Sequence, residues 1–122
     1  MKAAPFTYHD PGTLEDLVGL LGSLEDLKVL AGGQSLMPML NMRFSQPTHV
    51  VDLNGVEGLD GISECNDAIY IGAMTRQSEL LKHPKIAAKL PVMHEALGWV
   101  GHFQTRNRGT IGGSLCHLDP SA

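Results

Sequence analysis

The sequence has 122 residues, 43% of them hydrophobic and 18% charged, a balance typical of a folded globular domain rather than of a disordered chain. A formal net charge of −4, with no run of Lys or Arg, excludes the basic surface of a nucleic-acid-binding protein. The N-terminus lacks the apolar stretch of a signal peptide and no apolar run reaches the length of a membrane span, so we predict a cytoplasmic protein without membrane insertion.

The first part of the chain, residues 1–55, alternates between short strands and helices and is expected to form one lobe. Thr13 is expected to cap a helix that runs to Leu21, because apolar residues recur there at helical spacing and Gly22 can end it. Residues 34–42 fit either a helical turn or an irregular loop. The strands predicted in this lobe are 6–8, 28–31 and 48–53.

A second lobe, residues 56–122, is expected to begin with a hairpin. Asn66-Asp67 is a favourable two-residue turn between the predicted strands 62–64 and 68–72. Two helices are expected to follow, one capped by Thr75 and running through Leu81, and a longer one over 86–100 that Pro91 interrupts.

The last segment, residues 103–122, is glycine-rich and polar, and we expect it to be mostly extended. No closing helix or strand is predicted after Pro120. This pattern leads us to expect that the natural protein continues beyond Ala122, in the same chain or in a neighbouring one.

The two cysteines, Cys65 and Cys116, have no CxxC spacing. They are compatible with a disulfide but more typical of reduced thiols in a cytosolic protein. They are too few to hold an iron–sulfur or zinc cluster on their own, and the histidines show no metal-ligand spacing. We therefore predict neither a metal site nor a catalytic constellation on this chain.

The run Ala31-Gly32-Gly33-Gln34-Ser35-Leu36 follows a predicted strand directly. Successive glycines adopt backbone conformations that are closed to other residues, so their N–H groups can converge on an anion. Ser35 can add a hydroxyl donor. Because the net charge is negative, a phosphate would be held here largely by backbone N–H groups. For an isolated glycine pair, a simple tight turn is the more common interpretation.

A second glycine-rich run, Arg106 to Ser114, contains three glycines within five residues and the hydroxyls of Thr110 and Ser114. A surface loop is the alternative interpretation, although a loop seldom needs three glycines interleaved with hydroxyls. Two glycine pairs, each beside a hydroxyl, suit a ligand with two linked phosphates.

Two further features are less specific. Ile71 to Thr75 places small residues at a strand end, which suits either the approach of a flat ring to the backbone or an ordinary turn into a helix. Asp119 can accept hydrogen bonds from a ribityl or ribose hydroxyl, or cap a turn before Pro120.

The runs 31–38, 71–75 and 106–114 occur in the order and spacing of one family, and the chain resembles the N-terminal portion of the FAD-binding medium subunit of molybdenum hydroxylases. This group includes carbon monoxide dehydrogenase and the flavin domain of xanthine dehydrogenase. The resemblance implies an α+β fold of two α/β lobes, of the vanillyl-alcohol-oxidase/PCMH type, with FAD extended between them. Family members are longer, so the resemblance also implies a truncated chain that lacks parts of the FAD site near the isoalloxazine.

The resemblance implies that both glycine runs bind the pyrophosphate of FAD, although many members have Asn where this chain has Ser114. It implies no catalytic residue and no metal ligand. The cofactor-binding residues that it implies are Ala31, Gly32, Gly33, Gln34, Ser35, Leu36, Ala73, Thr75, Thr110, Ile111, Gly112, Gly113, Ser114 and Asp119.

The implied function is electron transfer in a hetero-oligomer. A large subunit would carry the molybdenum cofactor, a small subunit would carry two [2Fe–2S] clusters, and FAD would pass the electrons to an external acceptor. One alternative is a non-catalytic assembly fragment that docks on partner subunits without binding flavin. A second, a flavin oxidase of the vanillyl-alcohol type, has less support because no covalent-attachment residue is apparent.

Overall fold

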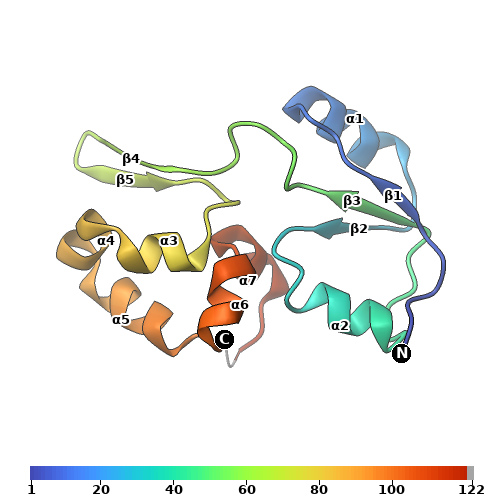
Figure 1. Cartoon of the computed structure of the whole chain (residues 1–122). Helices are drawn as coiled ribbons and strands as arrows, with labels where there is room; N and C mark the ends of the chain where they lie inside the picture. The colour runs from blue at the N-terminus through green and yellow to red at the C-terminus, as the bar shows by residue number, and fades with distance from the viewer. Residues whose placement is uncertain (121–122) are drawn as a thin grey trace. The chain divides into compact units, whose positions relative to one another are not determined.

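The computed structural model describes residues 1–120 and divides the chain into two compact units, Met1–Gly58 (unit 1) and Leu59–Ala122 (unit 2). Figure 1 shows the elements of both units. The predicted lobes, 1–55 and 56–122, are defined by a role in FAD binding, and that division stays a prediction.

Unit 1 contains a three-stranded sheet with the order β1-β3-β2, in which both strand pairs are parallel. Val50 and Val51 of the central strand are at most 1% exposed, as expected for a strand with a neighbour on each side. Because all strands run the same way, their carboxyl ends share one edge of the sheet. The strands are β1 (Thr7–His9), β2 (Leu27–Leu30) and β3 (His49–Asp52).

The two helices of unit 1 are α1 (Leu14–Ser23) and α2 (Leu36–Asn41). The predicted cap of α1 is confirmed, since the Oγ1 atom of Thr13 accepts a hydrogen bond from the N–H of Asp16 at 3.1 Å. Of the two alternatives for residues 34–42, the structure has the helix, with Leu40 buried.

Unit 2 begins with the predicted antiparallel hairpin, β4 (Ile62–Cys65) and β5 (Ala68–Ile71). Its turn residues Asn66 and Asp67 both have positive φ, 49° and 61°, which is the conformation that a two-residue type I′ turn requires. The turn chemistry visible in the sequence therefore accounts for this hairpin.

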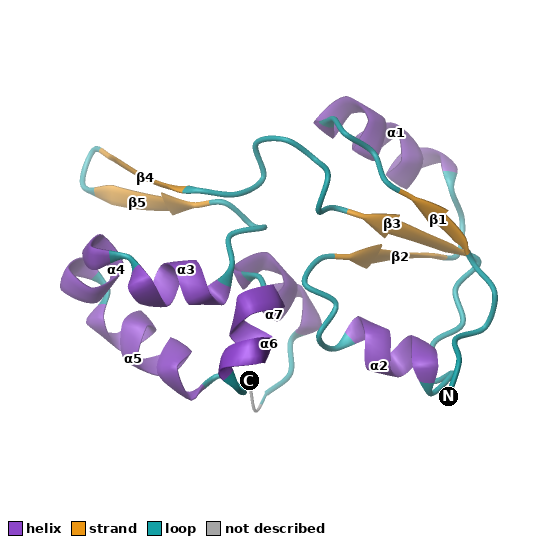
Figure 2. Ribbon diagram, viewed as in Figure 1, coloured by secondary structure: helices purple, strands orange, loops and turns teal. Residues whose placement is uncertain are grey.

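Five helices follow in the described part of unit 2, and Figure 2 shows them as purple coils. Leu80, Ile86 and Leu97 are buried at the centre of this unit, and apolar residues of the hairpin pack against them. None of the helices described in residues 1–120 is long and apolar enough to cross a membrane. The helices are α3 (Gln77–Lys82), α4 (Pro84–Lys89), α5 (Pro91–Trp99), α6 (Phe103–Arg108) and α7 (Ile111–His117).

Two predictions in unit 2 are wrong. Thr75 does not cap α3, because Arg76 holds the cap position while the Thr75 hydroxyl is buried against the backbone of Gly61. The segment from residue 103 is not extended: α6 and α7 occupy most of it, and residues 121–122 lie outside the described part. Thr110 caps α7 by accepting a hydrogen bond from the N–H of Gly113, which offsets the poor helix propensity of glycine.

Candidate functional site

The first glycine run forms the loop Ala31–Ser35 (hereafter the glycine loop) at the carboxyl end of β2, immediately before α2. Its first three carbonyl oxygens all accept hydrogen bonds. Ala31 O accepts from Asn54 Nδ2 at 2.9 Å, Gly32 O from Gln34 Nε2 at 3.2 Å, and Gly33 O from the N–H of Met37 at 3.1 Å. The carbonyl side of this loop is therefore fixed by the protein.

The amide side of the glycine loop is different. Among the residues that the structure describes, the N–H groups of residues 32–36 donate no hydrogen bond. Gly32 is nevertheless buried, and a buried N–H is normally paired with an acceptor. The loop thus offers donors to an acceptor that residues 1–120 do not provide.

Gly33 is required by the shape of this loop. Its φ of +73° is a left-handed conformation that side chains with a Cβ atom seldom adopt. An added Cβ would also lie 3.1 Å from Leu30 Cδ1 and 3.2 Å from Met37 Cγ, which is tighter than ordinary contact.

Polar side chains from the other two strands lie at the same edge of the sheet. The phenol of Tyr8 donates to Asp52 Oδ2 at 2.6 Å, and the N–H of Asn54 donates to Asp52 Oδ1 at 2.8 Å. The hydrogen bond to the Asp52 carboxylate raises the pKa of Tyr8 to about 12. Because a phenol is protonated at neutral pH even at its ordinary pKa of about 10, the raised pKa extends the range in which Tyr8 donates to more alkaline solution.

In unit 2, the structure brings two of the three predicted runs together. The N–H of Ile111 donates to Thr75 O at 3.1 Å, and the N–H of Gly112 donates to Ala73 O at 2.8 Å. An added Cβ at Gly112 would lie 2.7 Å from Ala73 O, so only glycine allows this approach of the two backbones.

The second glycine pair therefore differs from the first. The N–H of Gly112 is bonded to Ala73 O, and the N–H of Gly113 is bonded to Thr110 Oγ1 at 3.1 Å. Thr75 uses its hydroxyl both to donate to and to accept from the backbone of Gly61. These groups build the site, and they have no hydrogen-bonding capacity left for a phosphate.

Ser114 ends this run, and its side chain retains a donor. Its Oγ accepts a hydrogen bond from Gln77 Nε2 at 2.8 Å, so the hydroxyl hydrogen points elsewhere. Gln77 is only 3% exposed, and its Oε1 atom has no hydrogen-bond partner in the described residues. Gln77 thus links the start of α3 to the end of the glycine run.

Asp119 is exposed, and its Oδ2 atom lies 3.9 Å from Nε2 of His117. The runs around residues 73–75 and 110–114 meet within unit 2, whereas the glycine loop belongs to unit 1. The assignment of all these residues to cofactor binding stays a prediction.

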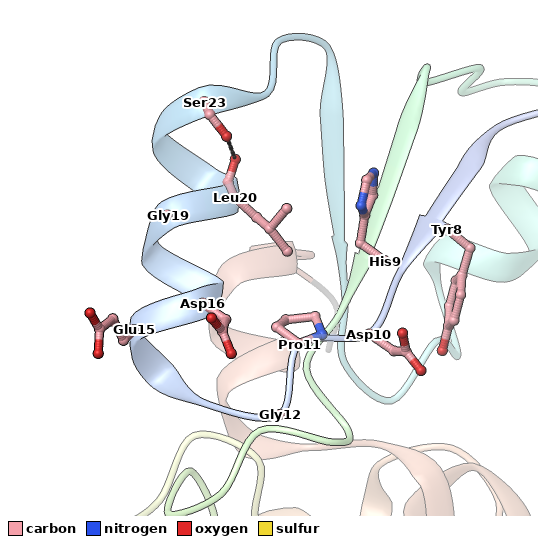
Figure 3. Close-up of a pocket in the computed structure, with 10 residues that line it drawn as sticks. All are labelled: Tyr8, His9, Asp10, Pro11, Gly12, Glu15, Asp16, Gly19, Leu20 and Ser23. Carbon is pink, nitrogen blue, oxygen red and sulfur yellow. Dashed lines mark hydrogen bonds between the residues drawn. The ribbon is translucent and has the colours of Figure 1, made fainter.

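A separate shallow hollow lies beside α1 in unit 1, and Figure 3 shows the residues around it. None of the predicted cofactor-binding residues lines it. Its rim carries the carboxylates of Asp10, Glu15 and Asp16, which repel phosphate. The hollow is therefore a poor candidate for the pyrophosphate site.

Asn54, Asp52 and Gln77 were not among the residues predicted from the sequence. A signal for Asp52 and Asn54 existed, because ligands in open α/β sheets bind beyond the carboxyl ends of the strands. Asp52 lies near the end of the predicted strand 48–53, and Asn54 directly follows that strand. Gln77 carries no comparable signal, since its role depends on a contact with a residue 37 positions away.

The chain is similar to known proteins over its whole length. Residues 4–122 match the family described as FAD binding domain in molybdopterin dehydrogenase. The carbon monoxide dehydrogenase medium chain of Hydrogenophaga pseudoflava is 46% identical over 94% of this chain and 40% of its own length. The 6-hydroxypseudooxynicotine dehydrogenase complex subunit alpha of Paenarthrobacter nicotinovorans is 46% identical over 100% of this chain and 42% of its own.

Among solved structures, quinoline 2-oxidoreductase from Pseudomonas putida 86 superposes with a TM-score of 0.95 at 38% identity, covering 100% of this chain and 43% of that one. The chain thus spans about two fifths of the length of the curated relatives that it matches. These matches confirm the predicted α+β fold of an FAD-binding domain and the predicted cofactor, FAD. The chain belongs to the family of FAD-binding domains in molybdopterin dehydrogenases.

Proposed function

We propose that the chain is the FAD-binding part of an electron-transfer subunit in a molybdenum-containing hydroxylase or dehydrogenase, where electrons pass from iron–sulfur clusters of a partner subunit through FAD to an external acceptor. The molybdenum cofactor and the [2Fe–2S] clusters would lie on a large and a small partner subunit of a hetero-oligomer. The enzyme would be cytoplasmic, in keeping with the two exposed, free cysteines.

The observation that carries the proposal is the arrangement of the glycine loop. Its carbonyls are bonded inside the protein, while the N–H groups of residues 32–36 have no acceptor in the described part of the chain. A pyrophosphate needs several donors, and on a chain with a net charge of −4 backbone N–H groups supply them without a basic cluster. The loop therefore fits the phosphates of FAD.

The second run supports the proposal in another way. The backbone bonds between 73–75 and 110–112 shape the segment, and the Ser114 hydroxyl, which accepts from Gln77, keeps its hydrogen for a further acceptor. We propose that the cofactor lies against the backbone of these two segments, at Ala73, Thr75, Thr110, Ile111, Gly112 and Gly113. Ser114 and Asp119 would then supply the polar contacts from unit 2.

When bound, FAD supplies the redox chemistry, and this chain supplies binding and orientation. The matching proteins are named for carbon monoxide, 6-hydroxypseudooxynicotine and quinoline, which share little chemistry. Because proteins with such different substrates share this domain, we propose that the substrate is recognised outside this chain.

FAD release and FAD titration test the proposal. The purified protein is heat-denatured, and its supernatant is treated with phosphodiesterase, which raises flavin fluorescence by cutting FAD to FMN. Protein that carries no flavin is titrated with FAD while the quenching of flavin fluorescence is followed. The expected result is stoichiometric FAD or saturable quenching, and the absence of both would contradict the proposal.

The assembly fragment without flavin is the less favoured alternative, because the family that matches residues 4–122 is described as an FAD binding domain. Replacement of Gly33 by Val separates the two functions. Loss of FAD with intact assembly of the complex supports FAD binding, whereas lost assembly in a complex that never contained flavin supports a docking role.

A further inference from the structure

Hydrogen bonds connect the side chains at the carboxyl edge of the unit 1 sheet, and the bond from Asn54 to Ala31 O connects them to the glycine loop. We infer that Asn54 is a positioning residue for the FAD pyrophosphate, because it fixes the Ala31–Gly32 peptide so that the Gly32 N–H faces the phosphate. This inference deepens the proposed function and rests on it for the identity of the ligand.

The orientation of the Asn54 amide is fixed by its neighbours. Its Nδ2 atom donates both to Ala31 O and to Asp52 Oδ1, and neither oxygen can donate in return. The amide nitrogen, rather than the amide oxygen, must therefore face both groups. Each of its two hydrogens has an acceptor.

The bond to Ala31 determines where the next amide points. In a trans peptide the C=O and the following N–H point in opposite directions, and the described residues contain no cis peptide bond. With Ala31 O held toward Asn54, the Gly32 N–H is held away from it. The other two loop carbonyls are anchored by Gln34 and Met37, which belong to the same loop and helix. Asn54 is the anchor that comes from another segment, the turn that follows β3.

Asn54 is itself held in place. Its own N–H and its side chain both bond to Asp52, and Asp52 also accepts the Tyr8 hydroxyl at 2.6 Å. The ends of all three strands are thereby connected to the loop. Two consecutive glycines are flexible in isolation, so an external anchor lowers the entropy that the loop loses on binding.

The test uses the whole chain and three variants. Asn54→Ala removes the donor, and Asn54→Asp keeps the shape but replaces the NH₂ group by oxygen. Asn41→Asp is the control, since it makes the same charge change at an exposed residue at the end of α2. The measurements are the FAD dissociation constant, the urea midpoint, and ¹⁵N relaxation of the Gly32 and Gly33 amides without ligand.

The expected result is FAD binding about 3- to 10-fold weaker in Asn54→Ala, as for the loss of one hydrogen bond, and weaker still in Asn54→Asp. The glycine amides should become more mobile, with the urea midpoint close to that of the Asn41→Asp control. If both Asn54 variants bound FAD with wild-type affinity, or if the relaxation of the Gly32 and Gly33 amides were unchanged in both, the inference would be overturned while the proposed function would stand. If the wild-type chain binds no FAD, the proposed function fails and the inference falls with it.

Discussion

Replacement of Gly112 by alanine is expected to destabilise unit 2, although alanine is the better helix former. The added Cβ would lie 2.7 Å from Ala73 O and 2.8 Å from Ala73 Cβ, and neither atom is the end of a flexible side chain. Helix propensity favours alanine by up to about 1 kcal/mol. Two effects act in the opposite direction and lower the free energy of unfolding. Overpacking costs about 1–3 kcal/mol, and straining the hydrogen bond from the Gly112 N–H to Ala73 O costs about 0.5–1.5 kcal/mol. The net expectation is a loss of about 1–3 kcal/mol.

Urea unfolding followed by far-UV circular dichroism measures this change, with Gly98→Ala as the matched control. Gly98 lies in α5, and a Cβ there would meet nothing within 4 Å, so alanine should stabilise that helix. Hydrogen exchange of the backbone amide at position 112, which donates to Ala73 O in the wild type, gives a local readout and should accelerate in Gly112→Ala. If Gly112→Ala proved as stable as the wild type, close approach would not be the reason for glycine at this position.

Three further changes test other parts of the fold. The hydrogen bonds from Lys85 and Lys89 hold the pKa of Glu64 at about 2, below its ordinary value of 4.5. These bonds therefore stabilise the fold fully above pH 4.5, and the stabilisation is lost as the pH falls toward 2. The difference in urea midpoint between wild type and Glu64→Gln should therefore shrink from about pH 7 to about pH 2.5, and an unchanged difference would contradict the assignment. Thr13→Ala should cost about 0.5–2 kcal/mol through the lost cap, whereas Thr13→Ser should cost little in the same denaturation assay. Gly33→Ala should cost about 1–2 kcal/mol because of its left-handed φ, and Gly33→Asn less; equal losses would argue against backbone strain.

Local chemistry allowed much of the fold to be predicted. The hairpin turn at Asn66-Asp67, the Thr13 cap and the three strands of unit 1 each depend on neighbouring residues, and all occur in the structure. Pro91 was expected to interrupt a helix, and it stands at the first position of α5, where its missing N–H costs nothing.

The predictions that failed depend on tertiary contacts. Thr75 has the residue type of a helix cap, but its hydroxyl forms a better pair of bonds with Gly61, 14 residues earlier. The glycines at 112 and 113 argue against a helix by propensity alone. The helix forms because Thr110 caps it and because glycine allows the approach to Ala73, which no local pattern reveals.

The sequence predicted which segments form the candidate site, but not which of their hydrogen-bond donors remain available. Both glycine pairs stand beside a hydroxyl in the sequence, which suggests one shared role. Their hydrogen bonds distinguish the two pairs. The N–H groups of the glycine loop have no acceptor among the described residues, whereas those of Gly112 and Gly113 are bonded to Ala73 O and Thr110 Oγ1. Spacing carries no information about which donors a fold consumes.

This difference decides how variants of the two pairs should be interpreted. A change at Gly112 must first break contacts that hold 73–75 against 110–112, so any effect on FAD will be accompanied by lost stability of unit 2. A change at Asn54 alters an exposed hydrogen bond next to the donors of the glycine loop, so its effect on FAD should appear at nearly constant stability. A plot of FAD affinity against the free energy of unfolding should therefore place the two classes of variants on different lines. If both fell on one line, the glycine loop would act through stability as well, and the N–H groups of residues 32–36 would not be the donors that hold the pyrophosphate.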